Sequence, residues 1–329
     1  MRAAFLPLVL FFTASITPPA IVDPRPAPPV ADTLIEATPI PLDPANRSAG
    51  RIGALRWLGG WELTSANPEF GGISAIAFDA GAFLAVSDAG GVFRFALGED
   101  GAITSARILM LPDGPAPARD GAPRKEDRDA EAIVFAPDTL HLWVAFERAN
   151  AVWRYSVHFE IEGHAEPAAM RGWPVNGGPE AMVRLPDGRF LILSEEAGSG
   201  PGTTAGLIFA ADPVESDAPP LRFAYVAPEG YVATDAAALP DGRLLILNRR
   251  FNFTEGPSAI LAVAPLDDLR EGGRLVPRPI ATLRAPLTVD NMEALAVGVE
   301  DGRTIVWIAS DDNFNPLQRT LLMKFELVE

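Results

Sequence analysis

Four acidic residues each open the same short phrase, in which the acid is followed by Ala and then by an apolar, strand-like run. The phrase begins at Glu131, Glu180, Asp235 and Glu293, and a degenerate fifth copy begins at Ser74. The copies recur about every 50 to 60 residues, and self-similarity at such a period indicates a repeat fold. If the repeats are propeller blades, the lead residues meet around one axis and their carboxylates form a single site.

Polar clusters follow the second strand of each repeat and add further acids. They are Asp88, Glu147-Arg148, Glu195-Glu196, Asn248-Arg249-Arg250 and Asp311-Asp312-Asn313. The second strand of a propeller blade returns to the face where the innermost strand starts, so we expect clusters and lead residues to converge. Carboxylates crowded in this way raise one another's pKa, and a hard divalent cation relieves the repulsion. Calcium suits a flexible ring of carboxylate and carbonyl oxygens better than magnesium does.

Two interpretations of these acids are open from the residues alone. In the functional one, the acids bind a cation while Lys125, Arg148 and Arg249 hold an anionic group of a substrate. In the structural one, the acids cap strand ends and form ion pairs with the arginines. Acids recur at equivalent places, at strand ends that share one channel mouth, and this favours the functional interpretation.

Several other kinds of site are excluded by the composition. The chain has no Cys, which rules out thiol catalysis and thiolate metal sites. Its three histidines, His141, His158 and His164, stand neither at lead positions nor in the strand-end clusters. No Gly-x-Ser-x-Gly turn, zinc-ligand spacing or Gly-rich phosphate loop occurs. The remaining candidates for ligands and catalytic groups are side chains with oxygen atoms, chiefly the carboxylates.

The repeats read as hairpins that are followed by further strands. Residues 180–196 show the pattern as EAMVRL, PDG and RFLILSEE, and Asp-Gly between two apolar runs predicts a tight turn. The last repeat lacks an outer strand, which residues 52–63 could supply. We therefore predict an all-β fold, a single β-propeller of five blades, closed by the N-terminal strand pairing with the last blade. Six blades are the alternative.

The N-terminus differs in composition from the repeats. Residues 3–16 are apolar and follow Arg2, a stretch too short to span a membrane and typical of a secretory signal. We expect a signal peptide at residues 1–20, a Pro-rich, disordered tether at residues 21–50 and the propeller domain at residues 51–329. An uncleaved N-terminal anchor is the alternative.

The charge of the chain bears on its partners. A net charge of −16 would repel nucleic acid and anionic membranes and attract a cation, although it would also serve simply to keep an exported protein soluble. We expect a periplasmic or secreted monomer whose mature chain has no membrane span and binds a small anionic substrate.

Nearly everything after residue 50 contributes to a resemblance, in unbroken order. The runs include LGGWELTSANPEFGGISAIAFDAGAFLAVSD (58–88), KEDRDAEAIVF (125–135), GGPEAMVRLPDGRFLILSEE (177–196) and SDDNFNPLQRTLLMKFEL (310–327). They resemble the bacterial phytase-like family, which is named for an esterase-like activity of phytase. The resemblance implies an exported all-β propeller. The residues it carries over are Asp129, Glu131, Glu147, Arg148, Glu180, Asp235, Arg249, Glu293, Asp311, Asp312 and Asn313.

These features together favour an exported, calcium-dependent hydrolase of esters, and phosphate esters before others. The expected calcium ligands are Glu131, Glu180, Asp235 and Glu293, with Asp311 close by. Asp129 or Glu195 would be the general base, and Lys125, Arg148 and Arg249 would bind the substrate anion. Two alternatives are a non-catalytic ligand-binding propeller of the cell envelope and a calcium-dependent lactonase. The binding propeller would use aromatic platforms, for which the candidates are Trp143, Trp153, Trp173 and Trp307.

Overall fold

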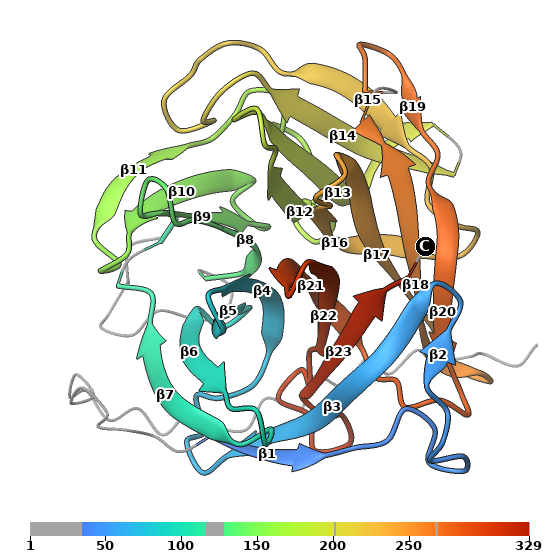
Figure 1. The fold of residues 1–329 in the computed structure, drawn as a ribbon. Coiled ribbons are helices and arrows are strands. Elements are labelled where there is room, and N and C mark those ends of the chain that lie inside the picture. Colours follow the sequence, from blue (N-terminus) through green and yellow to red (C-terminus); the bar gives the residue numbers. More distant parts are fainter. Residues whose placement is uncertain (1–34, 113, 116–127, 201, 267–268, 329) are drawn as a thin grey trace, which may run out of the picture.

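The protein is a five-bladed β-propeller (Figure 1). The computed structural model describes residues 35–112, 114–115, 128–200, 202–266 and 269–328. Within these ranges the strands form five sheets, so the prediction of five blades is confirmed and the six-bladed alternative is wrong. The described residues contain no helix with the length and apolar character needed to cross a membrane.

Four blades each begin with three strands that are consecutive in the chain, ordered from the channel outwards. Blade 1 contains β4 (Ile73–Asp79), β5 (Ala82–Ser87), β6 (Gly91–Leu97) and β7 (Ile103–Met110). Blade 2 contains β8 (Ala130–Ala136), β9 (His141–Phe146), β10 (Ala151–Ser156) and β11 (Ile161–Ala165). Blade 3 contains β12 (Pro179–Arg184), β13 (Phe190–Gly200), β14 (Thr203–Phe209) and β15 (Leu221–Tyr225), with β19 (Arg274–Leu275) at its outer edge. Blade 4 contains β16 (Val232–Ala238), β17 (Arg243–Asn252), β18 (Gly256–Pro265) and β20 (Arg278–Arg284).

Blade 5 joins the two ends of the described chain. Its strands are β21 (Met292–Glu300), β22 (Arg303–Ser310), β23 (Leu321–Leu327), β3 (Leu55–Ser65) and β1 (Ile35–Pro39), and β2 (Arg51–Ile52) pairs with β3. The pairing of β23 with β3 is antiparallel and places Leu322 opposite Trp61. Figure 1 shows the blue N-terminal strand beside the red C-terminal one. The predicted closure of the ring is thereby confirmed.

The folded domain begins earlier than the sequence suggested. Residues 35–50 were expected to belong to the extended tether, yet β1 pairs along its whole length with β3, and Ile35 and Leu42 are buried. The physical reason is that the outer edge of β3 offers unpaired backbone groups, which β1 satisfies while its apolar side chains pack inwards. The expected signal peptide at residues 1–20 lies outside the described residues.

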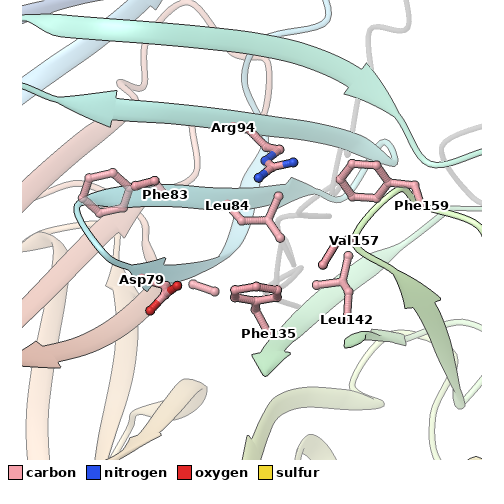
Figure 2. A pocket seen from close by; sticks show the side chains of 10 residues that line it. Asp79, Phe83, Leu84, Arg94, Phe135, Leu142, Val157 and Phe159 are labelled. Atoms are coloured by element: carbon pink, nitrogen blue, oxygen red, sulfur yellow. The ribbon is translucent and has the colours of Figure 1, made fainter. Parts of the chain in front are cut away.

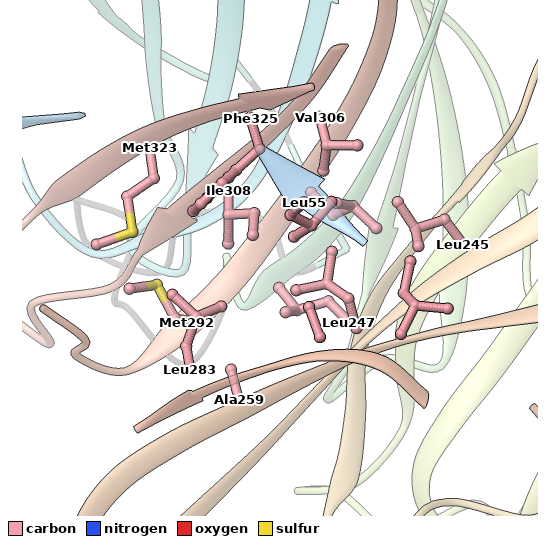
Figure 3. Close-up of a cluster of buried hydrophobic side chains, with 14 of the residues drawn as sticks. Leu55, Leu245, Leu247, Ala259, Leu283, Met292, Val306, Ile308, Met323 and Phe325 are labelled. Carbon is pink, nitrogen blue, oxygen red and sulfur yellow. The ribbon is translucent and has the colours of Figure 1, made fainter. Parts of the chain in front are cut away.

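The core lies between neighbouring blades. Side chains alternate along each strand, so the inner strands present apolar residues to the blade on either side. In Figure 3, Leu245 and Leu247 of blade 4 pack with Val306 and Ile308 of blade 5, and Leu55 joins them. Burying a side chain of this size stabilises the fold by about 1.5–3 kcal/mol. Contacts of this kind hold the five inner strands in a ring, in which each touches the next.

The Asp-Gly turns predicted from the sequence are present between the first and second strands of blades 3, 4 and 5. Gly188 and Gly242 adopt φ values of 88° and 87°, which a side chain would disfavour. Asp187 and Asp241 each accept a hydrogen bond from a backbone N–H two residues on, at 3.1 Å and 3.0 Å. These turns return each second strand to the face where its inner strand began.

Candidate functional site

A β-bulge interrupts every inner strand near its start. In each blade the pairing with the second strand skips one residue. The backbone of a skipped residue has no partner in the strand pairing, and its side chain points in a different direction from that of a regular strand residue. The skipped residues are Ser74, Glu131, Glu180, Thr234 and Glu293. The lead residue of the repeat is therefore the bulge residue in four blades, but blade 4 uses Thr234 in place of the expected Asp235.

Asp235 occupies the position that Ala takes in the other blades, one residue beyond the bulge. It is 4% exposed, and its two oxygens accept hydrogen bonds from the N–H groups of Ala236 and Leu295, both at 2.7 Å. Burial raises the pKa of Asp235, and these two hydrogen bonds oppose the rise. The structure places Asp235 between β16 and β21 as a bond to the neighbouring blade, where the charge of Glu293 adds to the rise in its pKa.

The hydroxyl residues at the remaining bulges have a shared structural role. Ser74 donates a hydrogen bond to the carbonyl of Ala130, and Thr234 donates one to the carbonyl of Met292. In both cases the acceptor is the residue just before the bulge of the next blade. A hydroxyl can donate such a bond and an ionised carboxylate cannot, so Ser74 and Thr234 link the blades at the positions where they replace an acid.

A second set of side chains lies near the ends of the second strands, where three of them directly follow β5, β9 and β22 and two lie within β13 and β17. It consists of Asp88, Glu147, Glu195, Arg249 and Asp311. Glu147, for example, donates its backbone N–H to the carbonyl of Asp129 at 2.9 Å, and the corresponding bonds in blades 1, 3 and 5 measure 2.9–3.1 Å. This repeated backbone geometry gives the second set a common place in the blades, so four acids and one arginine stand around the channel mouth.

Carboxylates of blades 2 and 3 come close enough to share a cation. Asp129, Glu131 and Glu147 form one group and Glu147, Glu180 and Glu195 form another, and within each group the oxygens lie within 4.8 Å of one another. Because Glu147 belongs to both groups, the five residues form one continuous carboxylate cluster. The sequence identified Glu147 as a strand-end acid, but it did not indicate that this residue belongs to both groups of candidate ligands.

Two glycines bring the chain close to Glu147. One oxygen of this side chain accepts hydrogen bonds from the N–H groups of Gly177 and Gly178, the latter at 3.3 Å. A Cβ on Gly178 would lie 2.7 Å from the backbone oxygen of Glu147, and Gly177 has a φ of 125°. Neither position accommodates a side chain without strain, so the glycine pair holds Glu147 between the two groups.

Crowding and burial make the cluster costly to ionise. Burial and the charges of Glu180 and Asp129 raise the pKa of Glu131, while burial and the charges of Glu195 and Glu293 raise the pKa of Glu180. Burial also raises the pKa of Glu147 to about 7, despite its bonds to the glycine N–H groups. Among the described residues, neither Glu131 nor Glu180 has a side-chain hydrogen bond or ion pair.

Arginines border the cluster on both sides. The Arg148 Nε lies 3.0 Å from an Asp129 oxygen. Arg249 reaches across from blade 4, with its Nη2 3.0 Å from Glu195 and its Nε 3.0 Å from Glu293. Burial raises the pKa of Glu293 to about 8, with Arg249 opposing the rise. The structure thus brings the predicted Arg148 and Arg249 to the site, whereas Lys125 lies outside the described residues.

Blade 5 extends the site beyond the five-residue cluster. Glu293 accepts a hydrogen bond from Asn291 at 2.8 Å, and Asn291 accepts one from Arg249 at 3.2 Å. The charge of Asp311 contributes to the raised pKa of Glu293, so the two acids are neighbours. The repeat phrase could not identify Asn291, because the phrase begins at Glu293, two residues later.

A well-formed hollow exists elsewhere on the molecule and contains none of the predicted residues. It measures about 140 Å³ between blades 1 and 2 and is lined by Phe83, Phe135 and Phe159, with Asp79 and Arg94 beside them (Figure 2). Asp79 ends β4, whereas the bulge lies at its start, so this hollow opens at the opposite face. The carboxylate cluster remains the candidate site.

Comparison with known families agrees with the geometry. The profile of the phytase-like family, described as "esterase-like activity of phytase", matches residues 68–314. The chain belongs to the phytase-like family. The matched span includes every described residue of the candidate site, and it confirms the resemblance seen in the sequence. No curated protein matches this phytase-like chain.

Solved structures match this phytase-like protein at low identity. The β-propeller domain of Cps50 (Swd1) from Myceliophteria thermophila is 11% identical, with 90% of this chain and 100% of that chain covered and a TM-score of 0.40. A luciferin-regenerating enzyme is 10% identical, with 89% and 95% covered and a TM-score of 0.43. A putative glucose dehydrogenase from Thermus thermophilus is 14% identical, with 82% and 99% covered and a TM-score of 0.40. Likeness at this level has no bearing on the reaction of this chain.

Proposed function

We propose that this phytase-like propeller is an exported, calcium-dependent hydrolase of esters, with phosphate esters as the first substrates to test. The observation that supports this most directly is the carboxylate cluster at the channel mouth. Five carboxylates lie in overlapping groups, glycines hold the shared member, and burial raises the pKa of Glu131, Glu147 and Glu180, so the cluster costs stability when no cation is present. A site that only stabilised the fold would pair all of these acids with arginines, whereas only Asp129 and Glu195 of the cluster have such a partner among the described residues.

The donor set fits calcium. All five members offer carboxylate oxygens, and Ca²⁺ takes six to eight oxygen ligands in a flexible arrangement. Glu131, Glu147 and Glu180 would hold the ion, since Glu131 and Glu180 have no other side-chain partner in the described chain and Glu147 joins the two groups. When bound, calcium would supply a Lewis acid for the substrate oxygen and lower the pKa of a bound water.

The residues beside the ion would act on the proton and on the substrate anion. Arg148 fixes the carboxylate of Asp129, and Arg249 both fixes that of Glu195 and opposes the rise in its pKa. A carboxylate held in place in this way can accept a proton from water, so Asp129 and Glu195 are the candidate general bases. Both arginines retain exposed surface, which leaves donors for a substrate anion.

Two other candidate functions are a calcium-dependent lactonase and a non-catalytic ligand-binding propeller. A lactonase would use the same cluster and differ only in substrate. A binding module would need exposed aromatic platforms, yet Trp143 and Trp307 are buried in the core. Trp173 is half-buried, packs against the core and lines a hollow of about 360 Å³ with Phe223 and Arg222, which includes none of the cluster residues.

Calcium titration by calorimetry, followed by assays of phosphate monoesters, carboxylic esters and lactones, tests the proposal. Wild-type protein should bind calcium and lose hydrolysis on chelation, and Glu131→Ala should lose both properties while remaining folded. Glu160→Gln removes a charge from an exposed acid outside the cluster and serves as the matched control. Unchanged calcium affinity in Glu131→Ala would remove this residue from the site. No calcium binding in the wild type would leave the acids as structural ion-pair partners.

Export is the part of the proposal that rests on the N-terminal sequence alone. Residues 3–16 have the apolar character of a secretory signal, and no described residue tests it. Fractionation of a host that expresses the full chain, with mass spectrometry of the mature N-terminus, should find cleavage near residue 20. A full-length chain that remains with the membrane fraction would support the uncleaved anchor instead.

A further inference from the structure

Three phenylalanine side chains are exposed to solvent at the channel mouth. Phe251 is 62% exposed, Phe253 is 97% exposed and Phe314 is 42% exposed, whereas the other described phenylalanines are buried or half-buried. All three lie at or shortly after the end of a second strand, β17 or β22, at the same face as the carboxylate cluster. Exposed apolar side chains grouped beside a polar site mark a place where a ligand or partner binds. We call these three residues the phenyl rim.

The β17–β18 hairpin places Phe251 next to Arg249. Its pairing has no register shift between Arg243 and Asn252, so side chains alternate without interruption, and Arg249 and Phe251 lie on the same face. Arg249 reaches Glu195 of blade 3 and Glu293 of blade 5, so that face looks onto the channel. Phe251 therefore lies two residues further along β17 than Arg249, on the side that Arg249 directs to the site.

The tip of this hairpin is fixed, so that its rings are preformed. The Asn252 side chain accepts hydrogen bonds from the N–H of Thr254 at 2.8 Å and from its hydroxyl at 2.7 Å. The Phe251 and Phe253 rings contact each other edge to face, with centroids 5.3 Å apart and planes at 81°. Rings that are already ordered lose little entropy when a ligand covers them.

Phe314 follows β22 of the neighbouring blade 5 and lies against blade 1. A Cβ on Gly72 would lie 2.5 Å from the Phe314 ring and 2.7 Å from an Asp88 oxygen, so the ring and this carboxylate share the space above Gly72. Asp312 fixes the arrangement by accepting hydrogen bonds from the N–H of Gly72 at 2.8 Å and of Phe314 at 3.0 Å. The charge of Asp88 contributes to the raised pKa of Glu131, which joins this side to the cluster.

We propose that the phenyl rim binds an aryl group of the substrate, so that the preferred substrates are aryl esters with one anionic group. This inference rests on the proposed hydrolase and names its substrate class. An aryl ester of this kind has an anionic end that suits the cation and Arg249, and a flat apolar end that suits preformed phenyl rings. A net charge of −16 argues against substrates with many phosphates, because each added charge is repelled.

Binding of two non-hydrolysable probes to the mature protein with calcium tests the inference. Phenylphosphonate and methylphosphonate present the same anionic group, and only the first has a ring. We expect phenylphosphonate to bind about tenfold more tightly, which corresponds to about 1.4 kcal/mol. In the double variant Phe251→Ala with Phe253→Ala the preference should fall to about twofold or less, with calcium affinity and methylphosphonate affinity unchanged. Val299→Ala, an exposed apolar residue near the far end of β21, should retain the full preference.

The possible results distinguish failure of the aryl-binding subsite from failure of the proposed calcium-dependent hydrolase. Intact calcium binding with equal affinity for both phosphonates, or with binding of neither, overturns the phenyl rim as a subsite and leaves the metal site standing. A preference that persists in the double variant also overturns it, because the ring would then bind elsewhere. Absence of calcium binding overturns the proposed hydrolase, and the inference with it.

Discussion

Replacing Glu147 by Gln should make the metal-free protein more stable at alkaline pH. The Gln oxygen can still accept the hydrogen bonds from Gly177 and Gly178, so the change removes a charge and retains the local structure. Burial raises the pKa of Glu147 from 4.5 to about 7. The folded state therefore keeps this proton when the unfolded chain has already released it, and wild-type stability falls as the pH rises from about 4.5 to about 7.

The size of the effect follows from this difference between the two states. At about 1.36 kcal/mol for each pKa unit, a pKa of about 7 in place of 4.5 sets an upper limit of about 3 kcal/mol. Water at the channel mouth screens the charges, so we expect a gain of about 1–2 kcal/mol for Glu147→Gln at pH 8. Below about pH 4.5 the residue is protonated in both states, and the gain should disappear.

Urea unfolding of metal-stripped protein at pH 4.5 and pH 8 measures this directly. The midpoint should rise in the variant at pH 8 only, with an unchanged slope, since the surface exposed on unfolding is the same. Excess calcium should reverse the order, because a ligand at one hundred times its Kd stabilises the wild type by about 2.7 kcal/mol. A metal-free variant that is less stable than the wild type at pH 8, or one with the same gain at both pH values, would refute the reasoning. Glu160→Gln is the control for a general charge effect.

Three further changes test other parts of the structure. Asp235→Ala should cost about 2–4 kcal/mol, because the buried N–H of Leu295 loses its acceptor, while calorimetry should show unchanged calcium affinity. Removal of residues 35–50 should cost at least about 3 kcal/mol in urea unfolding, since their apolar side chains are buried, whereas a disordered tether would be dispensable. Gly178→Ala should weaken calcium binding at least tenfold by displacing Glu147, and an unaltered calcium isotherm would contradict that role.

Much of the fold could be predicted because each repeat combines local signals. Apolar runs around Asp-Gly indicate hairpins, and their recurrence indicates blades, so the five-bladed ring and its closure by residues 52–63 follow from the sequence. The strand at Ile35–Pro39 could not be found in this way. Its Pro-rich surroundings resemble a tether, and the partner that stabilises it, β3, is a tertiary feature.

The candidate site was predicted in part. Glu131, Glu180 and Glu293 were found because residue type and bulge position coincide in their blades. In blade 4 they do not coincide, because the acid-Ala pair at Asp235 imitates the phrase while the bulge falls on Thr234. A bulge is set by how two strands pair, and a single strand's sequence does not reveal its register.

Closure of the ring also determines when the protein can become complete. The strands β1 and β3 are made first and pair with each other, whereas β23, the partner on the other edge of β3, begins at Leu321, close to the end of the chain. At about 5–20 residues per second, ribosomal synthesis leaves this edge of β3 without its partner strand for tens of seconds. During that time the free edge of β3 can pair with other chains, and a chain released early cannot complete its fifth blade. Because the pairing of β3 with β23 closes the ring, the propeller needs both of these strands to be complete. An open solenoid, in contrast, can lose a terminal repeat and remain folded.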